Sequence, residues 1–240
     1  VAQVLLKQVT AEDEIFVVEM GAYREGEIKA ICDIVKPDIG ILTGINEQHL
    51  SFFGSIENTI RTKGELLASL PKEGLALINA DSENSHKALK YNNADRVIRY
   101  GIGGDHEVKA THIVQQHNVL KFKVHYQRKR ADFEVPIFGE HYIQNLLGCI
   151  ACAIELGLSL KEIAEYAKSC EVLDGSLQIY QGIKEATIID DSYNANPDGF
   201  LAALNAVMNL KSSKVILVTP GMMELGAKSE EIHRRVGQRI

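Results

Sequence analysis

The stretch IGILTGINEQHLSFFGSIENTIRTKGELLASLPKEGLALINA (residues 39–80) contains two apolar runs on either side of a helical segment. The runs IGILTGI (39–45) and GLALINA (74–80) have the length and the nearly continuous apolar character of buried strands. Between them, Ser55 is a good N-cap for a helix and Pro71 ends the helical pattern. A strand, a helix and a second strand in this order predict a βαβ unit with parallel strands.

The same alternation continues on both sides of this unit. IFVVEM (15–20) and RVIRYG (96–101) are strand-like, and EGEIKAICDIV (25–35) has helical periodicity. From about residue 106 to 138 the pattern changes to alternating apolar and polar residues, which is typical of antiparallel hairpins. We therefore predict an α/β fold in which a mostly parallel sheet with helices carries a small antiparallel hairpin layer.

A second unit begins after two further helices. We place a domain boundary near Asp174–Gly175, so that residues 1–174 form a central domain and residues 175–240 begin a Rossmann-like C-terminal domain. Two predicted strands are too few for an independent doubly wound sheet, and VAQVLLKQVT opens in mid-pattern, so we expect a fragment at both ends. The elements predicted here are helices at about 141–156 and 159–169, a strand from Ala186, a helix at 198–210, the strand KVILVT (214–219) and a helix at 229–240.

Composition narrows the class of protein. The 240 residues include 26 basic and 32 acidic side chains, and a formal charge of −6 argues against a nucleic-acid surface. We find neither a signal-peptide pattern nor an apolar stretch long enough for a membrane span. We expect a soluble, cytoplasmic monomer that has neither a nucleic-acid nor a membrane partner.

Three polar residues follow predicted strands, where ligands bind in open parallel sheets. Glu19 ends the first strand, His49 follows the second by four residues, and Asp81 follows the third. Such a residue is more often a helix cap or a loop residue than a ligand. Glu19 and His49, from neighbouring strands, could instead share one Mg²⁺, which prefers oxygen but tolerates a single imidazole.

Lys63 occupies an unusual position in the helix after Ser55. Ile56, Ile60 and Leu67 define one apolar face, and Lys63 lies on it. Its amine could reach outward to water along its apolar stem. Alternatively, a desolvated lysine has a lowered pKa and can react with carbon dioxide. The carbamate that results would be an anionic oxygen ligand for a cation.

The segment DDSYNANPDGF (190–200) combines two acids, a tyrosine and two asparagines just after a strand. The structural interpretation is an Asx-Pro turn before a helix that starts near Pro197. The functional interpretation is that Asp191 binds ribose hydroxyls while the asparagines present amides to a ligand. Both interpretations stay open.

With these motifs, the chain resembles the Mur ligase family, the ATP-dependent amide-forming enzymes of peptidoglycan synthesis. The motifs follow the order of the family over nearly all 240 residues. They are VVEMGAYREGEI (17–28), TGINEQHLSFFGSIENTIRTKGEL (43–66), FGEHYIQN (138–145), DDSYNANPDGF (190–200) and PGMMELG (220–226).

The resemblance implies a role for each candidate residue. It implies that Glu19, His49 and a carbamylated Lys63 bind Mg²⁺, that Asn145, Asp191 and Tyr193 contact ATP, and that Asn194 and Asn196, with Lys63, belong to the catalytic cleft. The implied activity joins D-alanyl-D-alanine to a UDP-N-acetylmuramoyl peptide through an acyl phosphate. That reaction would serve cell wall biogenesis, cell shape and cell division.

The chain also departs from the family pattern. The printed sequence has no phosphate-binding run of the type G-x-x-G-K-[ST], so we expect these residues alone to turn over no ATP. Ser176 stands in GSLQ where the family usually has GRLQ, and TGINEQHL (43–50) replaces TNIGPAHL. The alternatives are another Mur-type ligase, similar to folylpolyglutamate or cyanophycin synthetases, and a non-catalytic Mur-like binding or scaffold protein.

Overall fold

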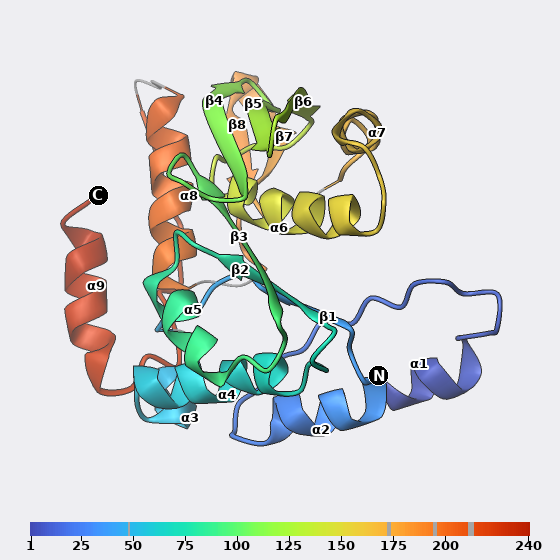
Figure 1. Ribbon diagram of the computed structural model, residues 1–240. Helices are drawn as coiled ribbons and strands as arrows, with labels where there is room; N and C mark the ends of the chain where they lie inside the picture. The colour runs from blue at the N-terminus through green and yellow to red at the C-terminus, as the bar shows by residue number, and fades with distance from the viewer. Residues whose placement is uncertain (48, 172–173, 194–195, 211–213) are drawn as a thin grey trace.

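The computed structural model describes residues 1–47, 49–171, 174–193, 196–210 and 214–240. Its centre is a six-stranded sheet in the order β1-β2-β3-β4-β5-β6 (Figure 1). β1 (Ile39–Leu42), β2 (Leu75–Asn79) and β3 (Arg96–Ile102) are parallel, and β4 (Val108–Gln116) pairs parallel with β3. The βαβ prediction from the 39–80 stretch is confirmed.

The hairpin prediction is also confirmed, and the hairpins continue the main sheet. β5 (Val119–Tyr126) pairs antiparallel with β4, and β6 (Lys129–Val135) pairs antiparallel with β5. Alternate residues of β5 are buried, namely Leu120, Phe122 and Val124. One face of this half of the sheet therefore packs on the core, as the period of two predicts.

Helices cover both faces of the parallel half of the sheet, and β2 is therefore buried on each side. Leu75 and Leu77 belong to the core under α6 (Tyr142–Glu155) and α7 (Leu160–Ala167). Ala76 and Ile78 belong to the opposite core, under α4 (Ile56–Ala68). Figure 1 shows α4 and α5 (Glu83–Ala88) on one side of β2 and β3, and α6 on the other.

The helix after Ser55 begins and ends where the sequence predicts. The Ser55 hydroxyl accepts the N–H of Asn58 at 3.2 Å, which caps α4. α7 begins with a capping box, in which Ser159 and Glu162 each accept a backbone N–H from the other. The remaining elements of the first 174 residues are α1 (Ala2–Lys7), α2 (Glu27–Val35), α3 (Leu50–Phe53) and the short 3-10 helix η1 (Leu89–Tyr91).

The C-terminal part consists of a hairpin and two helices. β7 (Gln178–Gln181) and β8 (Thr187–Asp190) form a separate two-stranded antiparallel sheet. Pro197 stands at the first position of α8 (Pro197–Asn209), and a small core joins α8 to α9 (Ser229–Gly237). The short 3-10 helices here are η2 (Ile183–Glu185) and η3 (Gly226–Lys228).

Two predicted strands are wrong. Residues 15–20 and residues 214–219 are not strands, and neither segment pairs with a strand in the part of the chain that the structure describes. Val17 is 87% exposed and Val218 is 90% exposed. A strand needs hydrogen-bonded neighbours, and residues 15–20 line the same cavity as β1 without pairing with it. Apolar character alone therefore predicted these two strands wrongly.

No described helix combines the length and the apolar character that a membrane span requires.

Candidate functional site

A cavity of about 1050 Å³ runs along the whole of β1, from the residues before the strand to the loop after it. Its wall comes from residues 13–23, from β1 and the loop after it, and from parts of α2, α4 and α6. Four predicted site residues from four separate segments line it, namely Glu19, His49, Lys63 and Asn145. The fold therefore gathers on one surface residues that are up to 126 positions apart (145 − 19 = 126). The part of the cavity beyond Leu42 lies at the carboxyl end of β1, the end at which open parallel sheets bind ligands.

Lys63 is held part-buried in the middle of α4, among the buried residues Ile60, Thr62 and Leu67. Burial lowers the pKa of Lys63, and the negative charge of Glu19 partly opposes that change. The lysine and the glutamate are thus close enough to interact electrostatically. A partly desolvated amine beside a carboxylate is chemically suited to reaction with carbon dioxide or to direct contact with an anionic substrate.

His49 has a left-handed backbone conformation, with φ 58°, at the start of α3. Its Nδ1 contacts the carboxylate of Glu224, which lies in the segment between α8 and α9. The ring also meets Tyr23 edge-on, with ring centroids 4.7 Å apart. In this arrangement the imidazole is engaged by a residue from the C-terminal part, which sequence reasoning did not predict.

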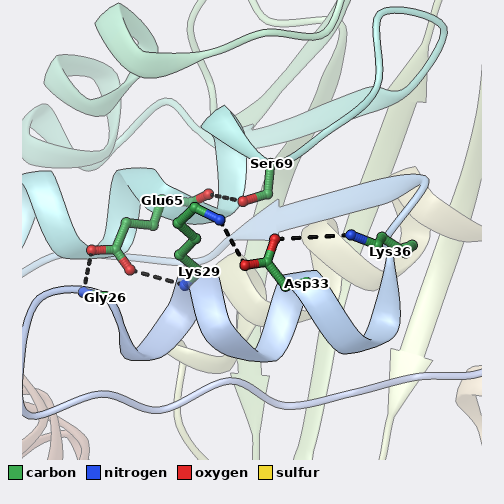
Figure 2. Close-up of polar contacts among 6 residues, drawn as sticks. All are labelled: Gly26, Lys29, Asp33, Lys36, Glu65 and Ser69. Atoms are coloured by element: carbon green, nitrogen blue, oxygen red, sulfur yellow. Dashed lines mark hydrogen bonds and ion pairs between the residues drawn. The ribbon is translucent and has the colours of Figure 1, made fainter.

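The relative placement of α2 and α4 depends on Glu65, two residues after Lys63. Figure 2 shows its carboxylate accepting the backbone N–H groups of Gly26 at 2.6 Å and Lys29 at 2.9 Å, at the first turn of α2. Gly26 offers no side chain to cap this helix, so Glu65 supplies the missing acceptor from another element. This contact therefore connects α4, which carries Lys63, to the helix that follows Glu19 in the chain.

Figure 2 also shows two ion pairs on the exposed side of α2. Lys29 Nζ pairs with Asp33 at 2.6 Å, and Lys36 Nζ lies 3.9 Å from the same carboxylate. Both pairs are well exposed and contribute little to stability. Glu65, whose acceptor role links two helices, is the residue of this group that bears on the site. The weak cap at Gly26 was the signal by which it could have been found.

Asp81 has a structural role, as expected for a strand-end acid that is a loop residue. Its carboxylate accepts the N–H of Ile102 at 2.8 Å and the side-chain amide of Gln144 at 3.2 Å. These contacts tie the end of β3 and the first turn of α6 to the loop after β2. Asp81 thereby steadies the helix turn from which Asn145 faces the cavity.

Asp191 and Tyr193, in the segment before α8, contact the backbone of residues 175–177. The Asp191 carboxylate accepts the N–H of Leu177 at 3.2 Å, and burial raises the pKa of Asp191. Tyr193 donates its N–H to Gly175 at 2.9 Å while its side chain is 70% exposed. Neither residue lines the cavity within the described ranges. The structure therefore does not bring these two together with Glu19 and Lys63.

Asn196 connects the turn to the first half of the chain. Its side-chain oxygen caps α8 by accepting the N–H of Gly199 at 2.9 Å, and it also accepts the Asn46 amide at 3.2 Å. The predicted start of a helix near Pro197 is thus confirmed. Asn194, the other predicted asparagine, lies outside the described residues.

The described residues contain no group of three or more His, Cys, Asp and Glu side chains that could together hold a metal ion. Glu19 and His49 face the same cavity, but together they supply only two such groups. Lys63 becomes a third anionic ligand only if it is carbamylated. If Lys63 is carbamylated, the three residues supply oxygen ligands and one imidazole nitrogen, and this set of ligands is compatible with magnesium.

An α/β fold with polar strand-end residues around one cavity is typical of proteins that bind small ligands. Comparison with known proteins specifies the family. Residues 1–153 match the Mur ligase middle domain, and residues 177–240 match the Mur ligase glutamate ligase domain. The chain belongs to the Mur ligase family.

Several of its relatives share one name. The chain is 30% identical over 98% of its length to UDP-N-acetylmuramoyl-tripeptide--D-alanyl-D-alanine ligase of Haemophilus influenzae and 29% identical over 97% to the Escherichia coli enzyme of that name. It covers 50% and 52% of these two proteins, so it spans about half the length of the curated relatives it matches.

Solved structures agree on the fold. MurF from Acinetobacter baumannii has a TM-score of 0.84 at 27% identity, over 92% of this chain and 48% of that one. MurF ligase from Thermotoga maritima in complex with ADP has a TM-score of 0.83 over 98% of this chain and 54% of that one. At 24% identity, this second likeness concerns the fold alone. The predicted Mur-ligase-type α/β architecture is confirmed.

Proposed function

We propose that this chain is part of a ligase that uses ATP to join D-alanyl-D-alanine to a UDP-N-acetylmuramoyl tripeptide. The observation that carries the proposal is the gathering of Glu19, His49, Lys63 and Asn145 around one cavity. The names of its relatives supply the substrates. Such an enzyme would act in the cytoplasm, in peptidoglycan synthesis, with small molecules as its partners.

The reaction consists of two transfers. The terminal carboxylate of the muramoyl peptide attacks the γ-phosphorus of ATP, which releases ADP and leaves an acyl phosphate. The dipeptide amine then attacks the acyl carbon, the phosphate leaves with its bonding electrons, and the nitrogen loses a proton. Both steps require charge neutralisation and the exclusion of water.

Residues of this chain would contribute from two sides. Asn145 would contact the adenine from α6, while Asp191 and Tyr193 would contact the nucleotide from the C-terminal part. Asn194 and Asn196 would shape the cleft that receives the incoming amine. The central and C-terminal domains would meet near residues 174–175.

Glu19, His49 and carbamylated Lys63 would hold magnesium, which supplies positive charge opposite the phosphates when it is bound. The lowered pKa of Lys63 supports this role, because carbamylation requires the neutral amine. The contact between His49 and Glu224 would have to open or be shared for His49 to take part.

The test is phosphate release by the intact gene product with ATP, UDP-N-acetylmuramoyl tripeptide and D-alanyl-D-alanine. We expect release that depends on all three substrates and a product that contains the new amide. Release that requires glutamate and a folate in place of the dipeptide would contradict the proposal. Equally, binding of the peptide without any ATP turnover would favour a scaffold protein.

The role of Lys63 has its own experiment. Lys63→Ala should remove most turnover, because alanine keeps the helix but supplies no ligand. Added acetate should restore part of the activity if an oxygen ligand was lost. Equilibration of the unsubstituted chain with ¹³C-bicarbonate should give a carbamate carbon signal in NMR that Lys63→Ala lacks. Full activity of the variant, without that difference in the spectra, would rule out the carbamate.

We further propose that residues 1–240 alone do not hydrolyse ATP, because the printed sequence has no G-x-x-G-K-[ST] run to hold the β- and γ-phosphates. Phosphate release above background by the 240-residue chain would contradict this.

A further inference from the structure

The loop after β1 contacts the C-terminal part through an acidic side chain. Glu47 Oε1 lies 2.6 Å from Lys228 Nζ, and Glu47 Oε2 lies 3.8 Å from a guanidinium nitrogen of Arg235. The glutamate side chain is only 25% exposed. Each oxygen of one carboxylate thus faces a different cation, and both cations lie at or next to α9.

Further contacts join the same two segments. Ser51 donates its backbone N–H to the carbonyl of Glu224 at 3.1 Å. At Gly226, a Cβ would lie 3.4 Å from the Ser51 backbone, which is ordinary van der Waals contact, so the two segments lie against each other. The φ of +58° at this position favours glycine.

A third contact joins the loop to the turn before α8. Asn46 donates its side-chain amide to Asn196 at 3.2 Å, next to the N-terminus of α8. Asn46 and Glu47 are neighbours in sequence, yet they reach partners 150 and 181 positions away. The loop therefore touches the C-terminal part at two separate places.

We infer that this loop forms a polar clasp that holds the C-terminal part against the segment carrying His49, with Glu47 at its centre. The clasp consists of Asn46, Glu47 and Ser51 on one side and Asn196, Glu224, Lys228 and Arg235 on the other. Glu47 is a positioning residue, and the inference does not depend on the proposed ligase activity.

The strength of the clasp comes from the connection of its parts. A single exposed ion pair contributes little, since its solvation in water competes with the contact. Here one part-buried carboxylate contacts two cations, and the backbone hydrogen bond between Ser51 and Glu224 joins the same two segments a few residues away. Networks of this kind contribute more than their separate pairs. Loss of the Glu47 charge should therefore also loosen the Ser51 contact.

The Ser51 amide gives a direct measurement, because its exchange with deuterium reports on the hydrogen bond to Glu224. In the 240-residue chain, Glu47→Gln should raise the Ser51 exchange rate by about tenfold or more and leave that of Leu77, in the buried strand β2, unchanged. Small-angle scattering should show a larger radius of gyration. Lys228→Met should have the same effect, and the double variant should add little to either single one.

Glu165→Gln is the matched control. It breaks an exposed pair, Glu165 with Lys168 at 2.8 Å, which lies at the end of one helix and joins no separate segments. It should leave the Ser51 exchange rate unchanged. Two results would overturn the inference: a Ser51 rate in Glu47→Gln within about twofold of the original, or a matching rise at Leu77. The second would mean that Glu47 acts on overall stability.

Discussion

Replacing Glu65 with leucine should weaken the first turn of α2 and, through it, the placement of Lys63. The substitution removes two hydrogen bonds that the carboxylate accepts from the backbone N–H groups of Gly26 and Lys29. Loss of a helix N-cap costs roughly 0.5–2 kcal/mol, and hydrogen bonds to charged groups contribute about 1.5–3 kcal/mol each before solvation of the exposed residues is discounted. We expect a loss of about 2 kcal/mol in the free energy of unfolding for Glu65→Leu.

Glu65→Gln separates charge from shape. Glutamine keeps one acceptor oxygen, so this variant should lose about half as much, on the order of 1 kcal/mol. The assay is urea denaturation, combined with hydrogen exchange at the Lys29 amide, which should lose protection first. Glu165→Leu is the control and should cost under about 0.5 kcal/mol, because its pair with Lys168 is exposed. A Glu65→Leu variant as stable as this control would refute the capping role.

Three further predictions concern packing, titration and capping. Gly148→Ala should destabilise the fold by about 1–3 kcal/mol in urea titrations, because its Cβ would lie 3.0 Å from the hydroxyl of buried Tyr100; equal stability would show that α6 can shift. Asp191→Asn should raise stability at neutral pH, because burial raises the pKa of Asp191 and the ionised carboxylate therefore costs free energy in the folded state. The gain in stability should fade as the pH drops through the raised pKa towards the unfolded value of 3.8. A gain that persists in acid would contradict this. Ser159→Ala should cost about 1 kcal/mol and lower Tm by roughly 2–4 °C, since it removes one half of the capping box of α7, and an unchanged melting curve would argue against the cap.

The parts of the fold that the sequence predicted are those with a local signal. The alternation of apolar and polar residues predicted the hairpin that contains β5, and Ser55 and Pro71 predicted the two ends of α4. Both signals depend only on residues that are close in sequence. The apolar runs at 15–20 and 214–219 have the same local appearance. They are not strands because pairing depends on a neighbour in space, and periodicity holds no information about that neighbour.

The candidate site divides in the same way. Lys63 could be found because it interrupts an apolar helix face, and its lowered pKa agrees with that interpretation. Glu224 and Glu47 could not be found, because each acts on a residue about 180 positions away. An acidic residue in a loop has no pattern that distinguishes a solvated side chain from one that joins two parts of a fold.

The two hairpin turns between β4, β5 and β6 offer a practical advantage for experiments on this protein. Each turn has two exposed residues, and the first residue of each, His117 and Gln127, has positive φ. In the order of the sheet they belong to strands three or more places from β1 and its cavity. A fluorophore or an affinity tag attached at Asn118 or Arg128 would therefore lie at the end of the sheet that is remote from the cavity. Immobilisation on a surface through these positions would leave the cavity open to the solution.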